Sequence, residues 1–343
     1  MKKMLGIDLG GESIRVCQRH GVVLQEASVA AVDRADGTVI SVCSYAMSLA
    51  LRTPGNADLI YPAREHLAAN YMAIRRMFRY CMDCADVKGC ILLVAVPHGL
   101  TEQEERVLIS AAEDAGAKGV RLIRKSVAAA IGAGIEVLSP QYTLVADLGS
   151  TAAEISAVGE GGAYSVSIPA AGGHAMNVML ARELRDTKQV ALSDSAADDV
   201  KRNAGTVWLE DATRTPVTVR ALHLTDGVPC DITVTPDQAA QGLVSGVDAL
   251  VQGLHQFYDG LPGSVRDDIR IRGMLLTGGG SGLGGLDQLL KEEMGFSVTV
   301  AESASGCTAA GLIRILGDPE HYENDGLYYC NAEIGGSLED YSV

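Results

Sequence analysis

Two short loops combine an acidic residue with a glycine directly after an apolar segment. An Asp-Leu-Gly sequence occupies residues 8–10, and the same three residues return at 147–149, 139 positions further along the chain. Glycine lets the backbone turn so that successive N–H groups point at one phosphate oxygen. The carboxylates of Asp8 and Asp147 could each hold a water of a bound Mg²⁺, which prefers oxygen ligands. A single loop of this kind fits an ordinary hairpin, but two copies one domain apart predict a phosphate clamp.

A third glycine-rich run, Gly-Gly-Gly-Ser-Gly at residues 278–282, follows the apolar segment 273–277. Glycines at the end of a buried strand allow the backbone to approach a flat base or a phosphate closely, and the next segment opens a helix. The run is not a P-loop, because no Lys-Ser or Lys-Thr follows its glycines. We interpret it as an adenine-side contact of the second half of the clamp.

The elements that must position these loops follow one plan in both halves. Apolar runs typical of strands alternate with segments of helical periodicity, which predicts two α/β domains with mixed sheets and a ligand cleft between them. Thr101 and Glu104 form a capping-box pattern at the start of one helix. We expect strands at 22–29, 38–42, 91–97, 120–123, 165–168 and 273–277, and helices at 67–82, 101–115, 126–133, 173–185, 195–203 and 240–258.

Composition narrows the function classes. Apolar residues make up 47% of the 343, and no stretch approaches the ~20 apolar residues of a membrane span. The net charge of −15 argues against a nucleic-acid partner, whose binding needs Lys and Arg to neutralise phosphates. The N-terminal sequence has no signal-peptide pattern, so we expect a cytoplasmic protein. Cys81, Cys84 and Cys90 could form part of a zinc site, although a second CxxC is missing and core packing is the favoured interpretation.

The negative charge is concentrated at the C-terminal end. No Lys or Arg follows Arg314, and residues 317–343 are expected to form a solvated acidic tail that serves solubility or binds a partner. The acidic residues in this part of the chain are Asp318, Glu320, Glu323, Asp325, Glu333, Glu339 and Asp340.

The motifs together resemble the MreB family of bacterial actins, over about residues 4–316. Order and spacing along the whole chain carry the resemblance more than any single motif. Besides the two Asp-Leu-Gly loops, the matching stretches are Ser-Val-Ala-Ala-Val at 28–32, Arg-Thr-Pro-Gly-Asn at 52–56, Val-Pro at 96–97, Ala-Gly-Ala at 115–117, Ala-Ala-Ala-Ile-Gly-Ala-Gly at 128–134, Ala-Gly-Gly at 171–173, Ala-Asp-Asp-Val-Lys at 197–201 and Thr-Gly-Gly-Gly at 277–280.

The resemblance implies an α/β fold of duplicated actin-like (ribonuclease H-like) domains, with a nucleotide cleft between them. The first domain would span 1–141 with a small subdomain at about 33–66, and the second 142–316 with a small subdomain at about 186–249. ATP or ADP with Mg²⁺ would be the cofactors, with the metal held through water by Asp8 and Asp147. Contacts to the nucleotide would come from Gly10, Gly11, Glu12, Ser13, Gly149, Ser150 and Thr151 at the phosphates, from Asp198, Asp199 and Lys201 at the adenosine and ribose, and from Gly278, Gly279, Gly280, Ser281 and Gly282 at the adenine.

The sequence departs from the family pattern at the residues that would act in catalysis. Lys125 stands where the family has the Glu that orients the attacking water, and His174 replaces an Asp. Both loops lose threonines, with Ala152 and Ala153 in the second, and the first gains Glu12. A charged lysine cannot accept a proton, and positioned acid–base help is typically worth ~10²–10⁴ in rate. We therefore expect nucleotide binding to survive more readily than hydrolysis.

Three functions follow from the resemblance. The first is an ATP-dependent filament protein that guides cell shape or wall synthesis and associates head to tail with itself. The second is a non-hydrolysing adaptor or regulator of a true MreB filament, and the third, a sugar-kinase-type enzyme, lacks a second substrate motif. A membrane surface is a further candidate partner, through the segment 81–88 and the helix with Arg75, Arg76 and Arg79, although core packing is the favoured interpretation of that helix.

Overall fold

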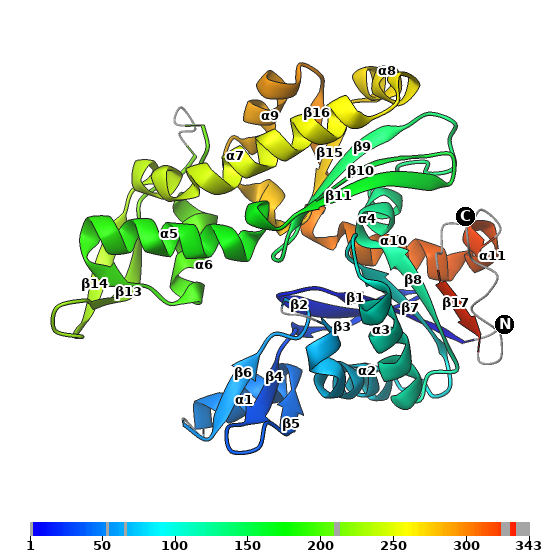
Figure 1. The fold of residues 1–343 in the computed structure, drawn as a ribbon, viewed down its shortest axis with the longest axis horizontal. Helices are drawn as coiled ribbons and strands as arrows, with labels where there is room; N and C mark the ends of the chain where they lie inside the picture. Colours follow the sequence, from blue (N-terminus) through cyan, green and yellow to red (C-terminus); the bar gives the residue numbers. More distant parts are fainter. Residues whose placement is uncertain (1–2, 53–54, 65–66, 209–212, 324–329, 334–343) are drawn as a thin grey trace. The chain divides into compact units, whose positions relative to one another are not determined.

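The computed structural model describes residues 3–52, 55–64, 67–208, 213–323 and 330–333. Thr53 and Pro54 of the motif at 52–56, and residues 324–329 and 334–343 of the expected acidic tail, lie outside the described residues. The chain divides into two compact units. Unit 1 contains Met1–Leu138 and Gly306–Val343, and unit 2 contains Ser139–Ser305. Figure 1 colours both along the sequence.

Unit 1 is built on a six-stranded sheet in which three central strands run parallel. β1 pairs with β7, and β7 with β8, in parallel, whereas the remaining pairs are antiparallel. The order across the sheet is β17 (Cys330–Glu333), β8 (Gly119–Arg124), β7 (Ile91–Val96), β1 (Met4–Leu9), β2 (Ser13–Gln18) and β3 (Gly21–Ala27). All six residues of β7 are buried, as expected for a parallel strand covered on both faces.

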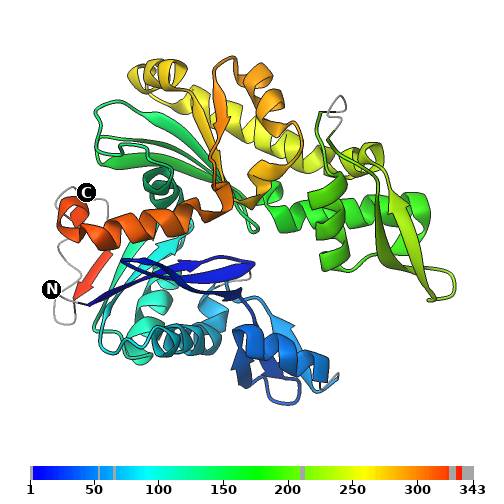
Figure 2. The ribbon, with the colours of Figure 1, turned by 180° about the vertical axis from the view of Figure 1, so that it is seen from behind.

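Helices cover both faces of this sheet. α2 (Tyr71–Cys84) and α3 (Glu102–Asp114) lie on one face, and α4 (Lys125–Gly132) and α10 (Cys307–Gly317) on the other, as Figures 1 and 2 show from opposite sides. The predicted capping box at Thr101 is confirmed. A small antiparallel sheet of β5 (Val39–Val42), β4 (Ala30–Asp33) and β6 (Ala57–Ile60), with α1 (Cys43–Arg52), completes the unit apart from short 3₁₀ and terminal turns.

Unit 2 repeats the arrangement. Its sheet has the order β11 (Gly162–Ile168), β10 (Ala153–Gly159), β9 (Thr143–Leu148), β15 (Met274–Thr277) and β16 (Val298–Val300). This is the order of β3, β2, β1, β7 and β8, so the predicted duplication and the α/β class are confirmed. The helices are α5 (Gly173–Lys188), α6 (Asp194–Ala204), α7 (Pro236–Gly260), α8 (Gly263–Arg272) and α9 (Leu286–Met294), and the small sheet is β12 (Val190–Ala191), β13 (Val217–His223) and β14 (Pro229–Val234).

The last long helix, α10, belongs to unit 1, whereas the predicted second domain extended to residue 316. Two glycines explain why α10 packs in unit 1, against α4. A Cβ on Gly311 would stand 1.8 Å from the carbonyl oxygen of Ala128, and one on Gly132 would stand 1.8 Å from that of Cys307. α4 and α10 therefore pack backbone to backbone, and Leu312 lies against Gly6 of β1. The expected limits of the two small subdomains stay predictions.

Two described parts of the expected acidic tail, residues 319–323 and 330–333, form regular secondary structure. α11 (Pro319–Glu323) follows α10, and β17 adds an antiparallel strand to the outer edge of β8. Backbone pairing of this kind does not depend on side-chain polarity. An acidic composition therefore did not exclude a strand at residues 330–333.

The close contact of α4 and α10 predicts a difference between two glycines of one helix. Gly311→Ala should lower the free energy of unfolding by about 1–3 kcal/mol, because the added methyl forces the helix backbones apart. Gly317→Ala is the matched control, since a Cβ there meets nothing within 4 Å, and it should change stability by less than about 1 kcal/mol. Urea unfolding of both variants measures this, and equal stabilities would contradict the packing.

Candidate functional site

Both acidic loops are tight turns closed by a backbone hydrogen bond. The N–H of Gly10 donates to the carbonyl of Ser13 at 3.0 Å, and that of Gly149 donates to Ala152 at 3.0 Å. A Cβ on Gly10 would stand 2.6 Å from the Ser13 oxygen, so only glycine closes the first turn. We call residues 8–13 the first loop and residues 147–152 the second loop; each directly follows the first strand of its sheet.

In the first loop, two cations hold the carboxylate of Asp8. Asp8 is buried, and Arg15 Nη1 lies 3.1 Å from its Oδ2. Lys125 Nζ lies 3.4 Å from Oδ1. Arg15 is placed there because it stands directly opposite Asp8 in the antiparallel ladder of β1 and β2. Lys125 is the first residue of α4, which follows β8.

A third cation pairs with the other acidic residue of the first loop. The guanidinium of Arg64 pairs with the carboxylate of Glu12, and its Nε donates to the carbonyl of Gly11 at 2.9 Å. Arg64 also lies over the ring of Tyr61, 4.1 Å from its centroid. The negative charge of Glu12, which would repel a phosphate, is thus compensated by an arginine 52 positions away in the sequence.

In the second loop, a neutral hydroxyl takes the place of the cations. The buried Thr277 donates its Oγ1 hydrogen to Asp147 Oδ1 at 3.0 Å. The residue opposite Asp147 in the ladder, where the first loop has Arg15, is the buried Glu154. The two loops therefore share a backbone geometry but differ in charge at the position opposite the aspartate, which is a cation, Arg15, in the first loop and an acidic residue, Glu154, in the second.

The glycine run packs directly on the second loop. Gly278 has a φ of +79°, and a Cβ on it would stand 2.5 Å from the carbonyl oxygen of Leu148. A Cβ on Gly280 would stand 2.9 Å from Leu148 Cβ. Gly279–Gly282 form a 3₁₀ turn in which the buried Ser281 donates its hydroxyl to Gly278. Glycine is thus needed for close backbone approach within unit 2.

The first turn of α5 lies on the other side of the second loop. The N–H of Gly173 donates to the carbonyl of Gly149 at 3.0 Å, and that of His174 donates to Ser150 at 2.8 Å. A Cβ on Gly172 would stand 2.4 Å from the carbonyl oxygen of Thr151, so this approach also requires glycine. The positive end of the 16-residue helix α5 therefore lies beside the predicted phosphate contacts.

Lys201, a predicted nucleotide contact, already uses all three of its N–H donors within unit 2. They reach the Gly173 carbonyl at 2.9 Å, Asn177 Oδ1 at 2.6 Å and Asp198 Oδ1 at 2.8 Å. Burial raises the pKa of Asp198, but hydrogen bonds from Lys201 and Arg202 outweigh it and hold that pKa below its usual value. Lys201 thus joins α6 to the start of α5, and Asp199 is exposed on α6.

Three residues that contact these loops were missed by sequence reasoning. Arg15 could have been found, since closing the hairpin at Gly10 puts it opposite Asp8. Thr277 ends the strand before the glycine run, and its partner Asp147 becomes visible only when β15 pairs with β9. Arg64 carries no local signal, because its partners come from a separate strand hairpin.

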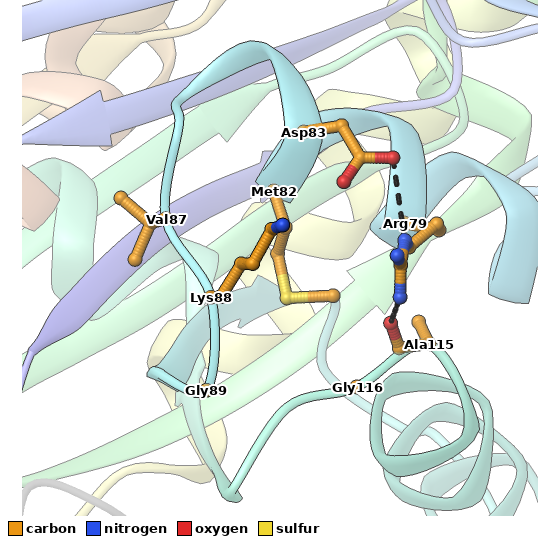
Figure 3. A pocket seen from close by; sticks show the side chains of 8 residues that line it. All are labelled: Arg79, Met82, Asp83, Val87, Lys88, Gly89, Ala115 and Gly116. Atoms are coloured by element: carbon orange, nitrogen blue, oxygen red, sulfur yellow. Dashed lines mark hydrogen bonds and ion pairs between the residues drawn. The ribbon is translucent and has the colours of Figure 1, made fainter.

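A cavity of about 140 Å³ lies elsewhere in unit 1, beside the segment 81–88 that was considered for membrane contact (Figure 3). Arg79 crosses it, donating to Asp83 at 3.2 Å and to the Ala115 carbonyl at 3.2 Å. Its lining is of mixed polarity, with Met82 and Val87 beside Lys88.

The neighbouring helix α2 packs as a core helix. Met77 and Phe78 are fully buried, and Arg75 and Arg76 donate to backbone carbonyls of their own unit. Among the described residues, no three His, Cys, Asp or Glu side chains gather in a group that could hold a metal ion. None of the helices in the described part of the chain has the length and apolar character needed to span a membrane.

A family model described as MreB/Mbl protein matches residues 2–324. The chain is similar to the cell shape-determining protein Mbl of Bacillus subtilis, with 31% identity over 90% of this chain and 93% of that protein. It is also similar to the cell shape-determining protein MreB of Escherichia coli K12, with 31% identity over 90% of this chain and 91% of that protein.

Solved structures show the same fold. MreB5 of Spiroplasma citri bound to ADP has a TM-score of 0.87 at 21% identity, covering 94% of this chain and 98% of that chain. The same protein bound to AMPPNP has a TM-score of 0.85 at 20% identity, covering 95% and 99%. The MamK double helical filament has a TM-score of 0.71 at 15% identity, covering 91% and 98%.

The hydroxyl that holds Asp147 gives a stability prediction. Thr277→Val keeps the shape of the side chain but removes a buried hydrogen bond to a carboxylate, so the free energy of unfolding should fall by about 1.5–3 kcal/mol. Thr218→Val, which removes an exposed hydroxyl pair with Thr233, is the matched control and should change it by less than about 0.5 kcal/mol. Equal losses in urea unfolding would show that the Asp147 bond contributes no stability.

Proposed function

This chain belongs to the MreB/Mbl family, and we propose that it is an actin-like protein that binds an adenine nucleotide and assembles with copies of itself into filaments that help to determine cell shape. The observation that carries the proposal is the repeated glycine-closed loop after β1 and β9, with the glycine run packed on the second copy. The neighbouring MreB5 structures, bound to ADP and to AMPPNP, support the choice of ligand.

Backbone donors and glycines are the proposed nucleotide contacts. The first loop offers residues 10–13 and the second offers 149–151, where the start of α5 adds a favourable helix dipole. The glycine run at 278–282 leaves room for a flat base, because its residues carry almost no side chains. Asp198, Asp199 and Lys201 complete the proposed site, with Lys201 acting chiefly to position α5 through its three internal hydrogen bonds.

The first loop favours holding a nucleotide over cleaving it. Lys125 occupies the position that the family gives to the glutamate next to the attacking water, and its ammonium has no free electron pair to accept a proton. An ammonium can instead bind phosphate oxygens and so stabilise the bound nucleotide. We therefore propose slow turnover, with the bound nucleotide controlling assembly.

A second candidate function rests on the same lysine. A family member that binds nucleotide without cleaving it could act as an adaptor or regulator on filaments of an active MreB relative. Both candidates need nucleotide binding, and they differ in whether this chain polymerises by itself.

Nucleotide binding is tested by thermal unfolding in the presence of ADP and ATP, with and without Mg²⁺. A ligand at 100 times its Kd should add ~2.7 kcal/mol of apparent stability, seen as a higher Tm. Gly280→Ala should bind more weakly because its methyl displaces Leu148, whereas Gly260→Ala, in open space at the end of α7, should respond like the wild type. A Tm that neither nucleotide raises under any of these conditions would reject the proposal.

Assembly is tested by sedimentation and electron microscopy with and without nucleotide. The filament proposal expects nucleotide-dependent pelleting and visible filaments of the purified chain, formed through a head-to-tail contact that does not close. A chain that stays monomeric in every nucleotide state would contradict it. Pelleting only together with filaments of an active MreB relative would instead establish the adaptor function.

A further inference from the structure

The carboxylate of Asp8 is the group expected to hold a Mg²⁺ at the first loop, and its surroundings do not fit that ion. One oxygen lies 3.1 Å from Arg15 Nη1 and the other 3.4 Å from Lys125 Nζ. A divalent cation here would stand beside two fixed positive charges, which repel it strongly where water is excluded. Mg²⁺ also keeps several of its own waters, and Asp8 is buried with only 4% of its surface exposed.

The ammonium of Lys125 lies where phosphate-binding charge is needed. A Cβ built on Gly10 would stand 3.8 Å from Lys125 Nζ, so the ammonium borders the turn whose N–H groups are proposed to face the phosphates. The lysine side chain is 14% exposed, and low exposure strengthens its attraction for an anion. An ammonium binds phosphate as a compact point charge, as the lysine of P-loop proteins does.

The charges around Asp8 favour an anionic ligand at the first loop. Two cations, Arg15 and Lys125, share the single carboxylate of Asp8. A second cation beside a glycine loop attracts a negatively charged ligand.

We propose that Lys125 takes the place of Mg²⁺ at the first loop, so that this chain binds its nucleotide without requiring a divalent metal ion. The inference rests on the proposed nucleotide binding and deepens it. Asp8 then acts through Lys125: it fixes the ammonium beside Gly10 with Arg15 holding its second oxygen. Positive charge reaches the phosphates through a side chain, and the metal-free nucleotide is the preferred ligand.

The test measures the affinity of ADP by equilibrium dialysis in Mg²⁺ and in EDTA. Wild-type affinity should agree in the two buffers within about threefold, well under the tenfold that 1.4 kcal/mol represents. Lys125→Met keeps the length of the side chain but removes its charge. It should weaken binding in EDTA by about tenfold or more, and Mg²⁺ should restore much of the loss, because one oxygen of Asp8 becomes free.

Two further variants separate charge from structure. Lys125→Arg keeps the positive charge and should keep the metal independence. Lys118→Met removes an exposed lysine of the same unit, at the residue before β8, and should behave as the wild type in both buffers. The wild-type comparison is decisive by itself if a Lys125 variant does not fold, which the Tm of the ligand-free protein reports.

The outcomes distinguish failure of the proposed role of Lys125 from failure of nucleotide binding itself. Wild-type binding that is lost in EDTA and recovered in Mg²⁺ would overturn the proposal that Lys125 takes the place of the metal ion, while leaving the proposed function intact. Metal-independent binding that Lys125→Met leaves unchanged would also overturn it, because the charge would then come from elsewhere. Binding in neither buffer would overturn the nucleotide proposal and this inference with it.

Discussion

A backbone hydrogen bond closes the turn after the first strand of each unit, from Gly10 to Ser13 and from Gly149 to Ala152. The turn allows the next strand to return antiparallel, so the register of the whole hairpin depends on it. It also leaves an aspartate at the end of the strand and a set of N–H groups at its tip. The positions of Lys125, Thr277 and the glycine run relative to these carboxylates therefore depend on the two turns.

Although the turns are alike, the charges of the residues around them differ between the two units. The position opposite the aspartate is Arg15 in unit 1 and Glu154 in unit 2, although the strands around them pair alike. In the first loop two cations, Arg15 and Lys125, contact Asp8, and in the second loop the hydroxyl of Thr277 contacts Asp147. The backbone of the turn is therefore the same in both units, while the side chain opposite the aspartate has changed from a cation to an acidic residue.

Small residues decide which unit a helix belongs to. α4 follows β8 and α10 follows β16, so the two helices hold equivalent places in the repeated plan, yet both pack in unit 1. Gly132 and Gly311 allow this pairing because each lies where any side chain would meet a carbonyl oxygen. The expected domain limit at residue 316 followed chain order, and it missed a contact that depends on the absence of two Cβ atoms.

The sequence by itself determined the features that depend on short stretches of chain. The two Asp-Leu-Gly turns, the capping box at Thr101 and the buried strand β7 are recognisable because local backbone requirements and hydrophobic patterns specify them. Only the tertiary structure decided the partners of the site's charges: Thr277 meets Asp147 from 130 positions away, and Arg64 meets Glu12 from 52. The same is true of Lys125, whose substitution was plain in the sequence but whose position on Asp8 was not. Side-chain partners at such distances are set by strand pairing and helix packing, which bring together residues that share no local signal.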